Sequence, residues 1–260
     1  SILVQDANGC TVTTNVIITE PANINATVTT TPSTCGNSDG SFVVNANGGT
    51  GAYQYSVNNG TTYQASSTFN NLLAGNYTVI VQDANGCTQS FPVAVSNQAA
   101  PAIASANGTN ATCNGADNGS IQITAGGGTG TLQYSIDNGT TYQSGSTFNN
   151  LAPGSYAIVV TDANGCNATS TVVITEPPAI TGTLTLTGTT CSNSNGAITV
   201  NANGGTGALQ YSINSGTTYQ SSATFNNLPA ANYTVTVQDA NACTFTVSGT
   251  LVDAPSPTIT

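Results

Sequence analysis

The stretch QYSVNNGTTYQASSTFNNLLAGNYTVIVQDANGC, residues 54–87, occurs three times with small changes. It returns as QYSIDNGTTYQSGSTFNNLAPGSYAIVVTDANGC at 133–166 and as QYSINSGTTYQSSATFNNLPAANYTVTVQDANAC at 210–243. Self-similarity at a fixed period is typical of a tandem array of related domains. The chain is therefore predicted to contain three complete repeats.

Proline-containing joints mark the predicted boundaries: ITEPA (18–22), SNQAAPA (96–102), ITEPPA (174–179) and VDAPSP (252–257). They predict a first repeat at 22–99, a second at 100–178 and a third at 179–257. Residues 1–21 would be the C-terminal part of a truncated repeat, and 258–260 the start of a next segment. Short joints that contain proline are stiff, so we expect the domains to form an elongated rod.

Within a repeat, polar and apolar residues alternate as in half-buried strands. SFVVNAN (41–47), SIQITAG (120–126), AITVNAN (197–203) and LQYSI (209–213) show this pattern. NNG, DNG and NSG after the QYS strands are hairpin turn signals, and DANG fits a type I turn. No segment has a sustained helical period. About seven short strands per repeat predict an all-β, Ig-like Greek-key β-sandwich.

Two further details belong to this prediction. Tyr77, Tyr156 and Tyr233 follow a Leu-containing corner, as in the tyrosine corner of Greek-key sandwiches. The third repeat has Ala231 and Ala242 where the others have glycine. Alanine at a left-handed position costs about 1 kcal/mol, so the third repeat is expected to be slightly less stable.

The seven cysteines follow the same period. Each repeat has an early cysteine (Cys35, Cys113 or Cys191) and a late cysteine (Cys87, Cys166 or Cys243), 52, 53 and 52 residues apart by subtraction. We expect each repeat to be closed by its own disulfide in an oxidising compartment, worth about 4 kcal/mol. Cys10 follows QDANG as Cys87 does, so its partner is expected outside the chain. Metal-binding thiolates are the alternative, disfavoured because CxxC spacing and histidine are both absent.

Composition excludes several function classes. The chain has no Lys, Arg or His and a formal net charge of −10. Binding to nucleic acid or to an anionic membrane surface needs cations. General acid–base catalysis near neutral pH usually needs His or Lys, so we expect no enzyme. No apolar run is long enough for a transmembrane helix, which predicts no direct membrane insertion.

The combined pattern GGTGxxQYS[IV]xxGTTYQxxxTFNNLxxxxY…V…DAN[GA]C, with ITEP closing units, resembles the SprB repeat. Such repeats build large surface adhesins of gliding bacteria in the Bacteroidota. The resemblance implies export by the type IX secretion system, an extracellular, cell-surface location and a role in adhesion during gliding motility. Implied partners are neighbouring repeats, surface polysaccharide and the gliding or secretion machinery.

Three possible binding sites follow from the residues. The GGTG segments (48–51, 127–130 and 204–207) lack the lysine of a phosphate loop and precede a strand, which favours a tight connection. Carboxylates could bind Ca²⁺, although Asp capping of turns is the favoured interpretation. The calcium candidates are Asp39, Asp83, Asp117, Asp162 and Asp239, with Glu20 and Glu176 at the joints. The GTTYQ tyrosines, Tyr63, Tyr142 and Tyr219, either stack on sugars or are half-buried packing residues.

The sequence thus favours a structural and adhesive stalk, part of a filament, with no cofactor unless Ca²⁺ binds. Tandem carbohydrate-binding modules are the alternative, which requires exposed and co-facial GTTYQ tyrosines. A glycosidase would need two acids about 5–10 Å apart in a cleft, and is disfavoured because acids are sparse.

Overall fold

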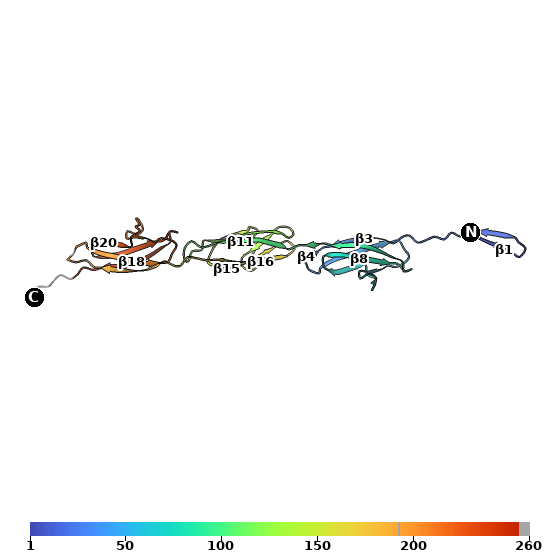
Figure 1. The fold of residues 1–260 in the computed structure, drawn as a ribbon, viewed down its shortest axis with the longest axis horizontal. Coiled ribbons are helices and arrows are strands. Elements are labelled where there is room, and N and C mark those ends of the chain that lie inside the picture. Colours follow the sequence, from blue (N-terminus) through green and yellow to red (C-terminus); the bar gives the residue numbers. More distant parts are fainter. Residues whose placement is uncertain (192, 255–260) are drawn as a thin grey trace. The chain divides into compact units, whose positions relative to one another are not determined.

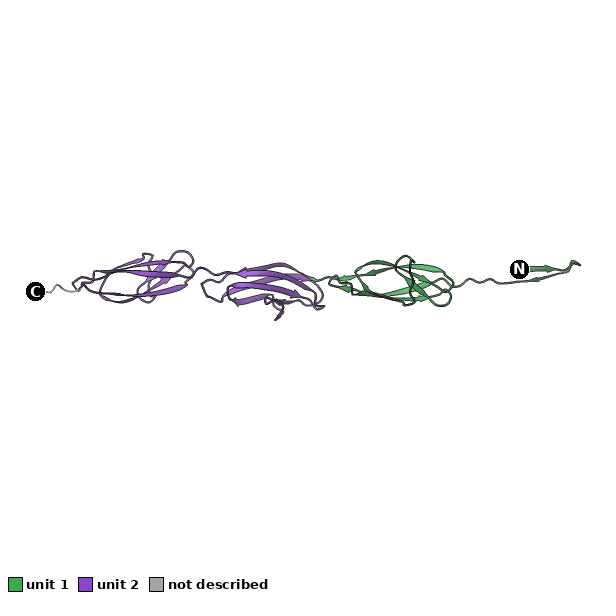
Figure 2. Ribbon diagram, turned by 90° about the horizontal axis from the view of Figure 1, so that it is seen from below, with its two compact units in different colours: residues 1–100 green, residues 101–260 purple. Residues whose placement is uncertain are grey.

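The computed structural model describes residues 1–191 and 193–254, all of them in strands, turns and connecting segments. The chain divides into two compact units: unit 1 comprises Ser1–Ala100, and unit 2 begins at Pro101 (Figure 2). Unit 1 contains a hairpin and the first repeat, and unit 2 contains the second and third. The predicted segment 258–260 and the end of the third repeat lie outside the described residues.

Each repeat folds as two three-stranded antiparallel sheets (Figure 1). In the first repeat the sheet orders are β3-β5-β7 and β6-β8-β9. The chain changes sheet between β5 and β6, between β6 and β7, and between β7 and β8, which is the Greek-key connectivity of an Ig-like sandwich. The fold class predicted from the alternation is confirmed. Strand bounds in the first repeat are β3 (Asn25–Thr31), β4 (Ser33–Thr34), β5 (Gly40–Asn47), β6 (Gln54–Ser56), β7 (Thr68–Leu72), β8 (Gly75–Gln82), β9 (Thr88–Val95) and β10 (Asn97–Gln98).

The second and third repeats repeat this plan within unit 2. Their sheets have the orders β11-β12-β14 and β13-β15-β16, then β17-β18-β20 and β19-β21-β22. The strands of the second repeat are β11 (Pro101–Thr109), β12 (Gly119–Gly127), β13 (Gln133–Ser135), β14 (Thr147–Leu151), β15 (Gly154–Thr161) and β16 (Asn167–Ile174). Those of the third are β17 (Thr181–Thr187), β18 (Gly196–Asn203), β19 (Gln210–Ser212), β20 (Thr224–Leu228), β21 (Ala231–Gln238) and β22 (Thr244–Leu251).

The core of each repeat lies between its two sheets. In the first repeat, Phe42 and Val44 of β5 face Val79 and Val81 of β8, and all four are almost fully buried. Their neighbours Val43 and Ile80 are only half-buried, as period-2 alternation predicts. Ile121 and Ile123 face Ile158 and Val160 in the second repeat, and Ile198 and Val200 face Val235 and Val237 in the third.

The turns that the sequence indicates are formed. Tyr55 and Gln64 exchange backbone hydrogen bonds of 2.8 and 2.9 Å, which closes the NNG hairpin. The amide of Gly86 donates to the Asp83 carbonyl at 3.0 Å, the bond of a four-residue turn. Tyr77 Oη donates to the Leu73 carbonyl at 2.9 Å. Its counterparts in the other repeats make the same bond at 2.7 and 3.0 Å, so the tyrosine corner is confirmed.

A short hairpin precedes the first repeat. It consists of β1 (Ile2–Gln5) and β2 (Thr11–Thr14), joined by a DANGC turn. Its apolar side chains are exposed, including Leu3 and Val12. In the described part of the chain there is no helix with the length and apolar character needed to cross a bilayer.

Candidate functional site

The two ends of a repeat carry its two cysteines. Cys35 lies just before β5, at the end where Gly40 pairs with Leu72 and Gly75 with Val95. Cys87 lies in the β8–β9 turn, at the other end of these strands. An eight-residue strand is about 26 Å long, whereas a disulfide joins Cα atoms less than about 7 Å apart. Geometry therefore forbids a bond between the early and late cysteines of one repeat.

The structure corrects the predicted pairing accordingly. Cys113 forms a disulfide with Cys243, 130 residues away, with a Cα–Cα distance of 5.6 Å. This bond joins the early cysteine of the second repeat to the late cysteine of the third. Cys87 and Cys191, which were expected to bond within their repeats, are free and exposed, as is Cys10. Cys35 and Cys166 are disulfide-bonded.

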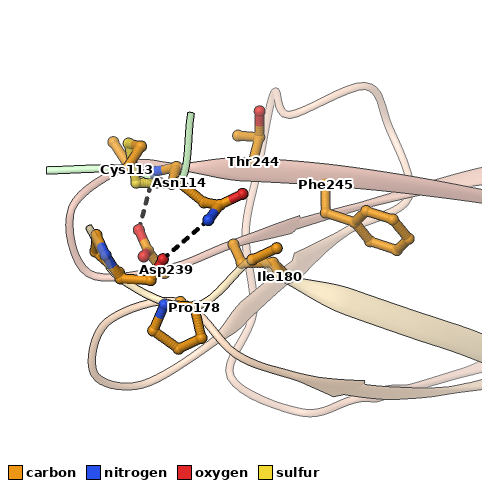
Figure 3. Close-up of a pocket in the computed structure, with 12 residues that line it drawn as sticks. Cys113, Asn114, Pro178, Ile180, Asp239, Thr244 and Phe245 are labelled. Carbon is orange, nitrogen blue, oxygen red and sulfur yellow. Dashed lines mark hydrogen bonds between the residues drawn. A yellow bond between two sulfur atoms is a disulfide. The ribbon is translucent and has the colours of Figure 1, made fainter. Parts of the chain in front are cut away.

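The joint between the second and third repeats is built from two loops (Figure 3). The loop of Thr112, Cys113 and Asn114 comes from the second repeat, and the Asp239–Cys243 turn comes from the third. Asn241 Nδ2 donates to the Thr112 carbonyl at 3.0 Å. Asn114 Nδ2 donates to the Pro177 carbonyl at 3.2 Å, where the chain passes into the third repeat. The disulfide is thus accompanied by hydrogen bonds that orient both loops.

A pocket of about 430 Å³ lies at this joint. Its lining combines the Cys113 loop with the start of the third repeat and the late-cysteine turn. The lining residues are Cys113, Asn114, Pro177, Pro178, Ala179, Ile180, Gly205, Asp239, Ala242, Cys243, Thr244 and Phe245. Its two cysteines are joined in the disulfide, and its carboxylate, Asp239, accepts backbone amide hydrogen bonds.

The DANGC aspartates hold the late-cysteine turn in shape. Asp239 is 5% exposed, and its Oδ1 accepts from the amides of Asn241 and Cys243, both at 2.9 Å. Its Oδ2 accepts from the amide of Thr206 at 2.7 Å, which ties the GGTG loop to the turn. Asp83 and Asp162 are bonded in the same way to their own repeats. This is the turn-capping arrangement that the sequence favoured.

These hydrogen bonds also affect acidity. Burial raises the pKa of Asp83, but the amides of Cys87, Thr50 and Asn85 outweigh it and hold the pKa below its ordinary value. The pKa of Asp162 is lowered by the same balance. Asp137, in the DNG turn, has its pKa lowered by hydroxyl donors from Ser135 and Thr141.

The aspartates proposed as calcium ligands do not assemble into a site. Asp39 binds the Thr34 hydroxyl and backbone amide, and its role passes to Asn118 and Asn195 in the other repeats, not to Asp117. Among the described residues, no three Asp, Glu, Cys or His side chains lie close enough to hold a metal. Asp83, Asp162 and Asp239 each accept three amide hydrogen bonds, so most of the acceptor sites of each carboxylate are already used.

The GTTYQ tyrosines pack on their own turns. The Tyr63 hydroxyl lies 3.0 Å from where a Cβ on Gly60 would be, and Tyr142 and Tyr219 approach Gly139 and Gly216 in the same way. Tyr63 and Tyr219 are half-buried, whereas Tyr142 is 43% exposed. A small pocket of about 170 Å³ adjoins Tyr63.

Comparison with known proteins gives one family match. The model of the SprB repeat matches residues 27–62 and 105–141. Two of the three repeats thus match the SprB repeat, each over its first half. Both matched regions run from the first strand of a repeat to the GTT turn, and the third repeat carries the same motifs. No curated protein sequence matches the chain.

Several solved structures are similar at low identity. Sidekick-1 immunoglobulin domains 1–5 are 15% identical over 90% of this chain and 60% of that one, with a TM-score of 0.35. Surface layer protein SbsC, domains 4–9, is 15% identical over 91% of this chain and 48% of that one, with a TM-score of 0.26. A Ca²⁺-stabilized, ice-binding adhesin of an Antarctic bacterium is 18% identical over 96% and 79%, with a TM-score of 0.39. The chain thus spans about three fifths of the first of these proteins.

The match to the SprB repeat supports an adhesive or structural repeat role and a cell-surface or extracellular location. The matching family is described as a repeat, and a disulfide covalently links the second repeat to the third.

Proposed function

We propose that the chain is a load-bearing segment of a large secreted surface adhesin that serves attachment during gliding motility. One observation carries the mechanical part of this proposal: the Cys113–Cys243 bond links consecutive repeats. Force applied across the two repeats passes through this covalent bond and bypasses residues 114–242 between its ends. The two sandwiches can then unfold under force, but the residues between the two cysteines do not add to the end-to-end length of the chain. The export route and the gliding role rest on the family resemblance.

Force spectroscopy tests the mechanical role. The variant with Cys35→Ser and Cys166→Ser keeps the Cys113–Cys243 bond and is pulled from its termini, oxidised and reduced. A bond that hides 130 residues shortens the oxidised chain by roughly 450 Å, at about 3.5 Å per residue. If the cysteines paired within repeats instead, this variant would keep the Cys191–Cys243 bond alone. That bond would hide about 180 Å. Equal lengths in the two states would contradict a load-bearing cross-link.

Carbohydrate binding is a second candidate, favoured by the exposed ring of Tyr142. Aromatic faces stack on sugars, and the same tyrosine recurs once in each repeat. The full chain is tested for binding to a polysaccharide panel, with calcium and with chelator. Saturable binding that is lost in the triple variant Tyr63→Ala, Tyr142→Ala, Tyr219→Ala would support direct adhesion by the repeats. Saturable binding that the triple variant keeps would refute the tyrosine site.

A further inference from the structure

A second pocket, of about 260 Å³, surrounds the free Cys87 in unit 1. It occupies the position in the first repeat that the joint pocket occupies in the third. Ile24, Gly49, Asp83 and Cys87 line it, and each has its counterpart 156 residues later, at Ile180, Gly205, Asp239 and Cys243. The joint pocket is also lined by two residues of the preceding repeat, Cys113 and Asn114. The lining at Cys87 comes from unit 1 alone.

The thiol of Cys87 sits on the same scaffold as the bonded Cys243. Asp83 accepts from the amides of Asn85 and Cys87 at 3.0 and 2.9 Å and from that of Thr50 at 2.9 Å. These are the bonds that Asp239 makes at the joint. Asn85 corresponds to Asn241, which donates to Thr112 across the joint, and Asn85 is exposed. The pocket therefore has the backbone, the thiol and the amide needed to receive a loop like that of Cys113.

The complementary loop is also present in the chain, at Cys191. Thr190, Cys191 and Asn195 form the same turn as Thr34, Cys35 and Asp39. The φ angles of Cys191 and Cys35 are 51° and 53°. The Thr190 amide donates to Asn195 at 3.0 Å, as the Thr34 amide donates to Asp39 at 2.8 Å. Cys35 is bonded in this turn, whereas Cys191 is free and exposed.

We propose that Cys87 and its pocket form a covalent docking site for the early-cysteine loop, Thr-Cys followed by a small polar residue, of a preceding SprB repeat. Cys191 is the matching early-cysteine loop, which bonds the late cysteine of a following repeat. The observed joint supplies the occupant, because Cys113 and Asn114 fill this position in the third repeat. Each bond forms from two thiols, which lose two protons and two electrons to a disulfide oxidant that is reduced to two thiols. This inference stands apart from the proposed function, because it requires neither force nor adhesion.

A peptide with the sequence of residues 108–118 tests the site on the full oxidised chain. Its cysteine is activated as a mixed disulfide with 5-thio-2-nitrobenzoate, so that attack by a protein thiolate joins the two sulfurs and releases the aromatic thiolate. Cys10 is the matched control, because its DANGC turn has the same Asp6 hydrogen bonds to Asn8 and Cys10. The second pocket is lined by residues around Cys87 and not by Cys10. Peptide mapping by mass spectrometry gives the rate at each thiol.

We expect the peptide to modify Cys87 about tenfold faster than Cys10 or Cys191, after correction for each thiol's rate with 5,5′-dithiobis(2-nitrobenzoate). Asn85→Ala should reduce this preference about fivefold, the effect of one hydrogen bond. Asn8→Ala, the equivalent change in the Cys10 turn, should leave the rate at Cys87 unchanged. A corrected rate at Cys87 no greater than at Cys10 would overturn the docking site. Binding to polysaccharide and behaviour under force have no bearing on this result.

Discussion

Ala242 is expected to lower the stability of the third repeat by a measurable amount. Its φ is 65°, in the left-handed region, where the equivalent Gly86 and Gly165 have φ of 83° and 79°. A Cβ is disfavoured there, so Ala242→Gly should stabilise the third repeat by about 1 kcal/mol. Ala231 also replaces glycine, but its φ is not positive, and it begins β21. Ala231→Gly should give no gain. Hydrogen exchange of β21 and β22 amides measures both variants, and equal stabilisation by the two would refute the explanation.

The Asp83 carboxylate is expected to be essential to its turn. Both oxygens accept backbone amides, and an asparagine side chain would present NH₂ to one of these donors. Asp83→Asn should lower the urea midpoint of the first repeat, because one part-buried amide donor loses its acceptor. Asp6→Asn is the control, because Asp6 caps the same turn in the exposed hairpin. Urea unfolding should separate the two variants, and an unchanged midpoint for Asp83→Asn would contradict the capping role.

Acid sensitivity follows from the same aspartates. A carboxyl whose pKa is lowered by folding stabilises the protein above its unfolded pKa, about 3.9, and loses this effect as pH falls through the folded value. For Asp83, Asp137 and Asp162, stability should be level from pH 7 to about 5 and fall below about 4. Asp137→Asn should make the second repeat less sensitive to acid, since the other repeats have Asn58 and Asn214 there. Hydrogen exchange of the second repeat at pH 6 and pH 3 compares the variant with the unmodified protein. An equal loss of protection at pH 3 in both would contradict the prediction.

At the scale of elements, the strands with alternating residues were predictable from the sequence. The strands β7, β14 and β20 were not. The expected 41–47 lies within β5, and 197–203 lies within β18. β7 consists of TFNNL, a sequence that does not alternate. It shifts register against β5, and Asn71 has a φ of 58°. A left-handed residue at a bulge breaks the period of two, so the pattern that identifies β5 cannot identify β7.

The approach of the segment before β3 to the GGTG loop gives an element-scale prediction. Gly48 has a φ of +81°, and a Cβ there would lie 2.0 Å from the Asn23 carbonyl oxygen. Gly36 also has a positive φ, +74°, but a Cβ there would meet nothing within 4 Å. Gly36→Ala should therefore cost about 1 kcal/mol, the backbone term alone. Gly48→Ala should cost roughly 2–4 kcal/mol, because the segment before β3 must also move. Thermal unfolding compares them, and equal losses would show that the close approach is unimportant.

At the scale of the whole molecule, periodicity could not determine the disulfide partners. An early cysteine recurs with each repeat, so pairing it with the late cysteine of its own repeat or of the next preserves the period equally well. What decides is the topology: the loop before β5 and the β8–β9 turn lie at opposite ends of the sandwich. That separation depends on strand pairing between distant segments, which cysteine spacing alone does not contain.

Two serine substitutions distinguish the pairings across the chain. Bonding within repeats predicts that Cys166→Ser frees Cys113 and that Cys191→Ser frees Cys243. The observed Cys113–Cys243 bond predicts that both variants leave Cys113 and Cys243 oxidised. Cys243→Ser, in contrast, should make Cys113 reactive. Alkylation under denaturing conditions, before and after reduction, followed by mass spectrometry, reads out each cysteine. Alkylation of Cys113 in the unreduced Cys166→Ser protein would show instead that Cys113 pairs with Cys166 in its own repeat. Consecutive repeats would then have no covalent link at this joint.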